Sequence, residues 1–238
     1  MSLLDRLSVK IFADGAELDE IVDLSKRPLI KGFTTNPTLM RKAGITDYRT
    51  FAQRLLRAVP DKPISFEVFS DQFAEMERQA GEISNWGDNV YVKIPITNTR
   101  RESSYDLVRH LSRAGVKVNV TAVFTVNQVH EVVDALQGNA PACISVFAGR
   151  IADTGVDPTP LMTEALECLR AAPNVELIWA SPREVLNIFH ADAVGCHIIT
   201  VTHDILKKLS LVGYDLREYS LDTVRMFHDD AKQAGFAL

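Results

Sequence analysis

The chain has 238 residues, of which 46% are hydrophobic and 24% are charged. This balance is that of a folded globular protein and excludes a disordered or fibrous one. A formal net charge of −5, without a block of lysines and arginines, argues against a nucleic-acid partner, because such binding depends mainly on neutralised phosphates. The length leaves one or two domains open, since barrels of about 250 residues form a single domain.

The cysteines and the N-terminal segment bear on the compartment. Cys143, Cys168 and Cys196 are odd in number, widely spaced and set among apolar residues, which is typical of free thiols in a reducing compartment. The first residues carry charges where a signal peptide needs an apolar run, and no later stretch approaches about 18 apolar residues. We therefore expect a cytoplasmic protein that has no membrane partner.

Short segments rich in β-branched and aromatic residues recur along the chain, each followed by apolar residues at helical spacing. After the first segment, for example, Leu18, Ile21 and Val22 share one face of a predicted helix. The predicted strands are 10–14, 32–36, 64–68, 89–95, 117–124, 142–147, 174–181 and 196–202. Strict alternation requires parallel pairing, because each helix returns the chain to the same edge of the sheet.

Eight such units predict an α/β fold, a single TIM barrel over about residues 9–213. An open doubly wound sheet would alternate in the same way, but the sequence has neither GxGxxG after the first strand nor a GxxxxGK[ST] loop. One helix is left over, expected at about 220–235, with Ser220 as its N-cap and an apolar stripe that includes Val224 and Phe227. We expect residues 1–238 to form one domain, with this helix packed on a neighbouring surface.

Polar residues recur two apart near the C-terminal ends of five predicted strands, where the inward face of a barrel is usually apolar. Unpaired buried polar groups cost about 1–3 kcal/mol each, so these side chains should bind one another, water or a substrate. The pairs are Thr34 with Asn36, Ser65 with Glu67, Tyr91 with Lys93, Asn119 with Thr121, and Ser181 with Arg183.

Lys93 is the one lysine at the C-terminal end of a predicted strand, inside the apolar stretch 90–96. Burial there disfavours the charged ammonium, and an amine must be neutral to attack a carbonyl. The alternative is a lysine that extends from the strand end into solvent.

Two carboxylates accompany this amine. Asp14 ends the first predicted strand and can act as general acid and base, and Glu67 ends the third. An amine flanked by two acids suits imine chemistry, in which a lysine adds to a ketone and the resulting cation accepts electrons from a breaking C–C bond. The alternatives are that Asp14 caps the next helix, that Glu67 only pairs with Lys93, and that Asn36 serves the turn beside Pro37.

Arg150 and Arg183 follow the sixth and seventh predicted strands and should reach the barrel mouth from neighbouring directions. Two guanidinium groups and the Ser181 hydroxyl can bind several phosphate oxygens. Arg100 and Arg101 lie in the loop after the lysine strand and could add positive charge or remain solvated.

A metal centre is not expected. The six histidines form neither H-x-H nor H-E-x-x-H, and most lie on predicted helices. We therefore expect no metal and no other cofactor.

Six segments, in chain order, carry a resemblance to a known family: 12–14, 34–38, 92–95, 119–121, 145–150 and 180–183. On these segments the chain resembles the transaldolases, specifically the short transaldolase and fructose-6-phosphate aldolase-like subfamily of Schiff-base aldolases. The resemblance implies that Lys93 forms an imine with a ketose phosphate, sedoheptulose 7-phosphate or fructose 6-phosphate. After an aldose phosphate leaves, the lysine retains a dihydroxyacetone unit and transfers this unit to a second aldose phosphate. This is a reaction of the pentose phosphate pathway.

The resemblance also implies roles for the other residues. Asp14 would move the proton of the C4 hydroxyl, while Glu67 and Thr121 would position the water of imine formation and hydrolysis. The residues implied to hold the three-carbon unit are Asn36, Asn119 and Ser145, and Thr34 and Phe147 are also expected to bind the substrate. Those implied to bind the acceptor phosphate are Arg150, Ser181 and Arg183.

The chain departs from the family pattern at Gly15, Val146, Pro182 and Glu184. These departures leave the identity of its sugar substrate open. Family members that act as plain aldolases carry Tyr and Gln where this chain has Phe147 and Glu67, which favours transfer. The alternatives are an aldolase that releases free dihydroxyacetone, a transaldolase for another sugar or sulfosugar, and a non-catalytic sugar-phosphate binder. The subfamily also implies a ring-shaped homo-oligomer with the C-terminal helix in its interface.

Overall fold

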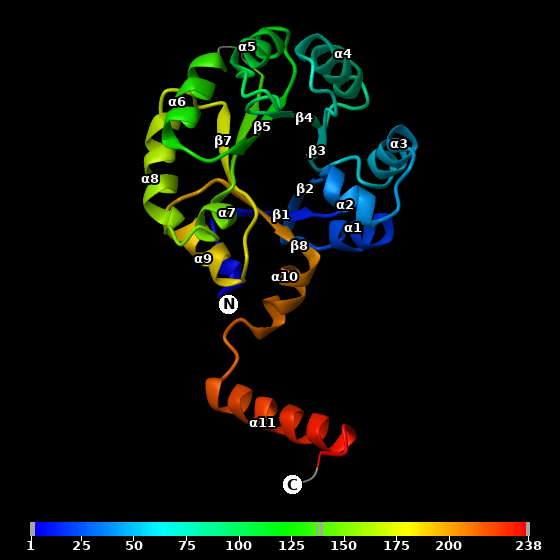
Figure 1. Cartoon of the computed structure of the whole chain (residues 1–238), viewed down its shortest axis with the longest axis vertical. Coiled ribbons are helices and arrows are strands. Elements are labelled where there is room, and N and C mark those ends of the chain that lie inside the picture. Colours follow the sequence, from blue (N-terminus) through cyan, green and yellow to red (C-terminus); the bar gives the residue numbers. More distant parts are fainter. Residues whose placement is uncertain (1–2, 137, 139, 237–238) are drawn as a thin grey trace.

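The computed structural model describes residues 3–136, 138 and 140–236. Parallel strands follow one another in sequence order and close into an eight-stranded barrel inside a ring of helices (Figure 1). The strands are β1 (Lys10–Asp14), β2 (Ile30–Thr34), β3 (Ile64–Glu67), β4 (Val90–Pro95), β5 (Val118–Val123), β6 (Ala142–Val146), β7 (Val175–Trp179) and β8 (Ile198–Thr202). The predicted TIM barrel is confirmed.

The helices include two that the strand-helix repeat did not predict, α2 after β2 and α7 after β6. The α-helices are α1 (Leu18–Ser25), α2 (Pro37–Lys42), α3 (Tyr48–Ala58), α4 (Phe73–Ser84), α5 (Tyr105–Arg113), α6 (Val126–Ala135), α7 (Ala148–Ala152), α8 (Pro158–Leu169), α9 (Leu186–Ala193), α10 (His203–Lys207) and α11 (Leu216–Gln233). Short 3-10 helices are η1 (Leu4–Arg6) and η2 (Lys208–Leu211).

Side chains alternate between two apolar regions along the strands. On β1, Ile11 and Ala13 belong to the large core between the barrel and its helices, whereas Phe12 points to the barrel interior. The interior cluster is small and consists of Phe12, Cys143, Ile178, Ala180 and Ile198. Because of this alternation, the interior near the C-terminal ends of the strands is occupied by the polar side chains described below.

Phe12 fills the middle of the barrel because Gly32 on β2 has no side chain. A Cβ at Gly32 would lie 2.5 Å from the Phe12 ring, so glycine alone permits this packing. Below the ring, toward the N-terminal ends of the strands, a cavity of about 210 Å³ is lined by residues that include Tyr91, Cys143 and Glu176. Phe12 is itself one of the residues that line this cavity.

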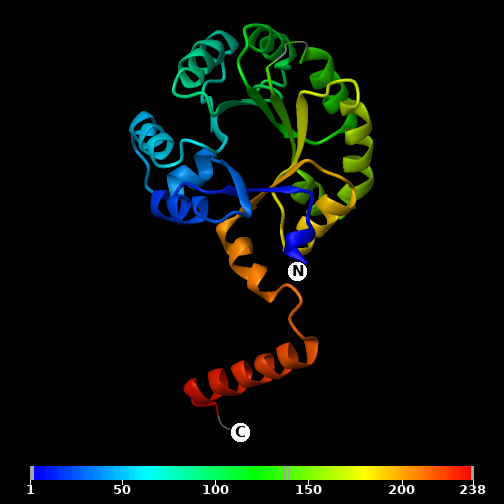
Figure 2. The ribbon, with the colours of Figure 1, turned by 180° about the vertical axis from the view of Figure 1, so that it is seen from behind.

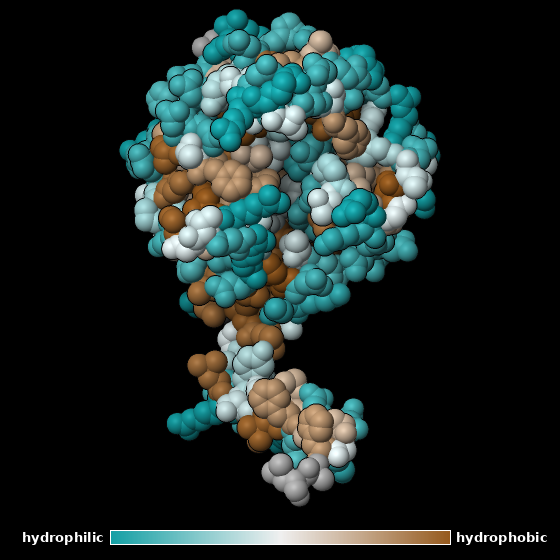
Figure 3. Space-filling view, viewed as in Figure 1, coloured by the Kyte–Doolittle hydropathy of each residue, from teal (hydrophilic) through white to brown (hydrophobic). Residues whose placement is uncertain are grey.

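The last helix stands apart from the barrel in both views of the ribbon (Figures 1 and 2). It begins at Leu216, because Asp215 accepts hydrogen bonds from the amides of Arg217 and Glu218. The prediction that Ser220 is the N-cap is therefore wrong, since Ser220 lies within the first turns of α11. None of the residues of α11 is buried, and apolar side chains are exposed on it and around its connection to the barrel (Figure 3).

None of the helices in the described part of the chain is long and apolar enough to cross a membrane.

Candidate active site

Lys93 lies near the C-terminal end of β4, where its register partners are Glu67 on β3 and Asn119 on β5. Only 7% of its side chain is exposed. Its Nζ donates a hydrogen bond of 2.8 Å to the carbonyl oxygen of Thr35 and lies 3.1 Å from Oε2 of Glu67. The alternative of a lysine extending into solvent is therefore wrong, whereas the expected pairing with Glu67 is present.

Asp14 ends β1 on the same side of the barrel. Its carboxylate accepts hydrogen bonds from the Thr34 hydroxyl at 2.8 Å and from Nδ2 of Asn36 at 3.2 Å. Burial raises the pKa of Asp14 above its usual value, while the positive charge of Lys93 and these two hydrogen bonds oppose the rise. Asp14 does not cap the next helix, because the N-cap of α1 is Glu17.

Asn36 lies beyond the end of β2, not on the strand as predicted, and it has two functions. Its Oδ1 accepts a hydrogen bond from the amide of Leu39 and caps α2, whose first residue is Pro37. Its Nδ2 is the donor to Asp14. The turn function is therefore confirmed, and the same side chain also contacts Asp14.

A buried row of polar side chains crosses the interior beside Lys93. Nδ2 of Asn119 donates to the Ser65 hydroxyl at 3.1 Å, and the Ser145 hydroxyl donates to Oδ1 of Asn119 at 2.8 Å. Thr121 is also buried and precedes Ala122, whose φ of 60° coincides with an irregularity in the pairing of β5 and β6. Asn119 and Ser65 thus bind each other, one of the outcomes expected for the polar side chains at the strand ends.

The helix α7 and the turn after β7 meet at the mouth. A Cβ at Gly149 would lie 1.5 Å from the carbonyl oxygen of Ser181, and Ser181 itself has a φ of 61°. Close packing of these two segments fixes Arg150 beside the turn. The guanidinium of Arg150 lies 5.2 Å from the centre of the Phe147 ring.

Arg183 is not a free cation. Its Nε donates to Oδ1 of Asp153 at 2.9 Å, and a second bond joins its Nη2 to Oδ2 of the same carboxylate. These bonds to Arg183 lower the pKa of Asp153. A phosphate bound here would therefore share Arg183 with Asp153, which the sequence interpretation did not foresee.

Acidic side chains close to the loop after β4 bind the polar groups of this loop. Arg100 contacts Asp71 at 3.3 Å and Glu102 at 3.0 Å, and the amide and hydroxyl of Thr99 also donate to Asp71. The charge of Arg100 is thus balanced by Glu102 in the same loop and by Asp71 in the loop after β3, while Arg101 is exposed with a φ of 65°.

The comparisons with known proteins agree with this geometry. Residues 11–238 match the family described as Transaldolase/Fructose-6-phosphate aldolase. The chain belongs to this family.

Relatives within the transaldolase family match over most of their length. A protein of Dehalococcoides mccartyi named "Probable transaldolase" is 35% identical over 202 residues, which cover 84% of this chain and 90% of the relative. A protein of the same name from Thermoanaerobacter sp. is 32% identical over 232 residues, covering 97% of this chain and 100% of the relative.

Two solved structures share the fold at 12% identity. A truncated 3-deoxy-D-arabino-heptulosonate 7-phosphate synthase from Thermotoga maritima has a TM-score of 0.52 and covers 82% of this chain and 74% of its own. A protein of the dihydrodipicolinate synthase family from Coccidioides immitis has a TM-score of 0.58, with coverages of 81% and 67%. At this identity the likeness concerns the barrel alone.

One residue at the site of this transaldolase-family barrel was missed from the sequence. The Thr200 hydroxyl on β8 forms a short hydrogen bond with the Thr34 hydroxyl and so extends the network of Asp14. The signal was present, because Thr200 and Thr202 are two apart on the eighth predicted strand.

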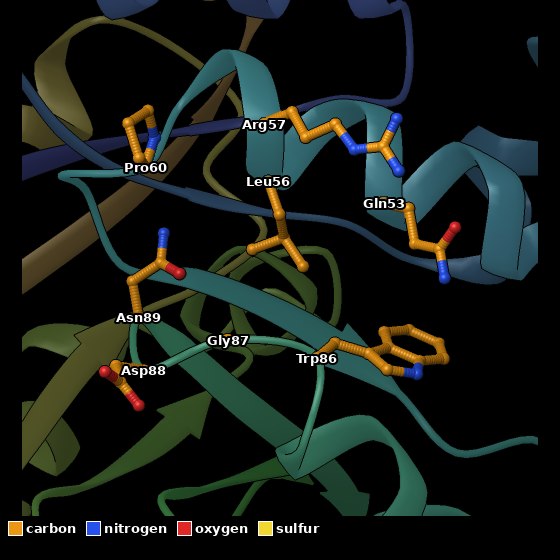
Figure 4. A pocket seen from close by; sticks show the side chains of 8 residues that line it. All are labelled: Gln53, Leu56, Arg57, Pro60, Trp86, Gly87, Asp88 and Asn89. Atoms are coloured by element: carbon orange, nitrogen blue, oxygen red, sulfur yellow. The ribbon is translucent and has the colours of Figure 1, made fainter.

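Other features of the described residues lie apart from this network. A surface hollow of about 610 Å³ opens beside the C-terminal end of α3, and its lining includes Leu56, Arg57, Trp86 and Asn89 (Figure 4). Asn89 precedes β4, so the hollow is at the rim opposite Lys93. The described residues include no group of three or more His, Cys, Asp or Glu side chains that could hold a metal ion.

Proposed function

We propose that this member of the transaldolase family transfers a dihydroxyacetone unit between sugar phosphates through an imine on Lys93. The observation that carries the proposal is the enclosure of Nζ of Lys93 by Glu67 and the Thr35 carbonyl, with the Asp14 carboxylate in the same interior. The family match and the names of the relatives support transfer as the reaction.

The reaction begins with the ketose phosphate. The ammonium of Lys93 first gives up a proton, for which Glu67 is an acceptor at 3.1 Å. The neutral amine adds to the C2 carbonyl, and the carbinolamine loses water as Glu67 and Thr121 guide the proton to the leaving hydroxyl. The products are a protonated imine and one water molecule.

Cleavage uses the imine as an electron acceptor. Asp14 takes the proton of the C4 hydroxyl, the C3–C4 bond breaks, and its electron pair passes into the imine to form an enamine. The aldose phosphate leaves. The enamine then attacks the aldehyde of the second aldose, Asp14 returns its proton to the new hydroxyl, and water releases the product from Lys93.

We propose that Asn36, Asn119, Ser145 and Thr34, with Phe147, hold the three-carbon unit. Arg150, Ser181 and Arg183 hold the acceptor phosphate, which competes with Asp153 for Arg183. Binding through several charge-assisted hydrogen bonds favours phosphorylated over free sugars.

Borohydride reduction with fructose 6-phosphate tests the imine. The wild-type protein should gain mass irreversibly at Lys93. Lys93→Arg should not, and its turnover with erythrose 4-phosphate as acceptor should fall about 10⁴-fold or more, because a guanidinium stays charged.

Lys117→Arg is the matched control, since Lys117 precedes β5 at the opposite rim, where its Nζ bonds the carbonyl of Asp88. It should keep normal turnover. Normal turnover of Lys93→Arg, or wild-type binding of the sugar without any trapped adduct, would refute the imine. Equal product formation with and without acceptor would refute transfer.

We further propose that the protein works in the cytoplasm, in the pentose phosphate pathway, as a ring-shaped homo-oligomer with α11 in the interface. Free Cys143, Cys168 and Cys196 support a reducing compartment. The exposed apolar side chains of α11 support a subunit interface, because such side chains on a protruding helix favour burial.

A further inference from the structure

The backbone of Glu67 is held by a side chain rather than by a neighbouring strand. The pairing of β2 with β3 is short and comprises Phe33 with Ile64 and Thr34 with Ser65. The amide of Thr35 adds one more bond to the carbonyl of Ser65. On this side of β3, the next amide and carbonyl along the strand are those of Glu67.

The Tyr48 hydroxyl, at the start of α3, occupies the position of the missing strand partner. The amide of Glu67 donates to the Tyr48 oxygen at 2.8 Å, and the Tyr48 hydroxyl donates to the carbonyl oxygen of Glu67 at 3.1 Å. One hydroxyl thus satisfies both backbone groups of a single residue. On its other edge β3 pairs with β4, where Glu67 is in register with Lys93.

The ring of Tyr48 is fixed by other aromatic rings. Its centre lies 4.4 Å from that of Phe69, 5.6 Å from that of Trp86 and 6.1 Å from that of Phe66. Burial raises the pKa of Tyr48 well above its usual range, so the hydroxyl retains the proton that it donates. The Thr35 side chain lies beside this hydroxyl and lowers its pKa slightly, while its own hydroxyl donates to the carbonyl oxygen of Ser65.

Tyr48 therefore binds the backbone of Glu67, one of the two residues that hold the Lys93 nitrogen. Glu67 supplies the carboxylate at 3.1 Å and Thr35 supplies the carbonyl oxygen at 2.8 Å. Tyr48 itself is separated from Lys93 by these residues, so any effect on the amine must pass through them.

We propose that Tyr48 is a positioning residue that sets the Glu67 carboxylate at the distance from Lys93 required for proton transfer. The proposal rests on the function proposed above for Lys93 and Glu67. It gives the start of α3 a part in the reaction, although Tyr48 touches neither the substrate nor the amine.

Tyr48→Phe tests the proposal because it removes the hydroxyl and keeps the ring. We expect kcat to fall about tenfold to a hundredfold, as a displaced catalytic group produces, while KM changes less than about twofold. Tyr105→Phe is the matched control, since Tyr105 is a partly buried tyrosine at the start of α5. It should leave both constants unchanged.

A double-mutant cycle with Glu67→Gln separates positioning from general loosening of the fold. If Tyr48 acts through Glu67, adding Tyr48→Phe to Glu67→Gln should lower kcat by less than about twofold. A full additional loss in the double variant would overturn the proposal, as would a wild-type kcat for Tyr48→Phe beside an impaired Glu67→Gln.

Phe69→Ala serves if Tyr48→Phe does not fold, because 53% of Phe69 is already exposed and its loss leaves the core intact. It should lower kcat about twofold to fivefold, and this loss should vanish in the Glu67→Gln background. A loss that persists there would overturn the proposal. A wild-type kcat for Glu67→Gln, by contrast, would refute the proposed function of Glu67 itself and with it the role of Tyr48.

Discussion

Asp14 and Glu67 are two carboxylates near one amine, in different surroundings. Asp14 receives hydrogen bonds from Thr34 and Asn36 and has its pKa raised by burial. Glu67 is in direct contact with the Lys93 ammonium at 3.1 Å. Two acids whose environments differ in this way can divide the proton transfers between them, Asp14 at the sugar hydroxyl and Glu67 at the amine.

Asp14→Asn should lower activity and raise stability at neutral pH. Because the pKa of Asp14 is above its usual value of 3.8, the folded state binds more protons than the unfolded state between the two values. Folding stability therefore falls as the pH rises above 3.8, because the buried carboxyl must then carry its charge in the folded state. The variant lacks this cost, and its oxygen can still accept from Thr34 and Asn36.

Urea unfolding at pH 7 and near pH 4, with turnover measured in parallel, checks this prediction. The advantage of Asp14→Asn should shrink toward pH 4, and kcat should fall about 10²-fold to 10⁴-fold. Asp61→Asn, on the exposed loop before β3, controls for the loss of one negative charge. A stability difference that does not change with pH would contradict the prediction.

The residues that could be predicted from the sequence are those on regular strands. Lys93, Asn119 and Thr121 follow from the two-residue period, because a register partner places them whatever the loops do. The contact of Tyr48 with the backbone of Glu67 could not be predicted, because it depends on how early the pairing of β2 and β3 ends. Nor could the bond between Arg183 and Asp153, which joins two loops.

At the scale of elements, the eight strands were predictable and several of their ends were not. The second strand is displaced two residues toward the N-terminus, at Ile30–Thr34 instead of 32–36, because Asn36 and Pro37 begin α2. The seventh ends at Trp179, before Ser181 enters a positive φ. Helix caps compete with strands at these ends, and spacing alone does not decide between them.

The contact between α7 and the turn after β7 gives a prediction for Gly149. Gly149→Ala should destabilise the fold by about 1–3 kcal/mol or more, because the added Cβ meets the Ser181 carbonyl oxygen at 1.5 Å, and backbone must move. Displacement of Arg150 and Ser181 should also raise KM for the acceptor phosphate.

Gly81→Ala is the matched control in α4, where a Cβ would meet no atom within 4 Å. It should stabilise the protein by about 0.5–1 kcal/mol, since alanine favours a helix interior. Thermal unfolding of both variants checks the pair. Equal stability of Gly149→Ala and wild type would show that the turn after β7 can move to accommodate a Cβ, and would contradict the prediction.

At the scale of the whole molecule, the barrel and α11 differ in how they are stabilised. The barrel has its own core, whereas α11 has exposed fractions of 61% at Val224 and 62% at Phe227. An isolated helix of this length gains little stability from its backbone alone, which supports the subunit interface proposed for α11. The apolar stripe was predictable from its spacing, but its distance from the barrel was not, because it depends on the connection at 211–215.

Phe227→Asp should lower the particle mass measured by light scattering after gel filtration. The wild-type protein should have a multiple of the 26.5 kDa chain mass and the variant a single one, because the charge opposes burial of the helix face. Gln233→Asp adds the same charge near the end of α11 and should leave the mass unchanged. A wild-type protein of single-chain mass would contradict the proposed ring.

The Phe12 ring against Gly32 has a consequence for the fate of the covalent intermediate. The ring fills the middle of the barrel, so we expect sugar and solvent to reach Lys93 through the same opening, at the C-terminal ends of the strands. An acceptor bound at Arg150 would then slow hydrolysis of the intermediate, because it would block the path of water to Lys93. Access through that opening would therefore determine how often the three-carbon unit is transferred to the acceptor and how often it is released by hydrolysis.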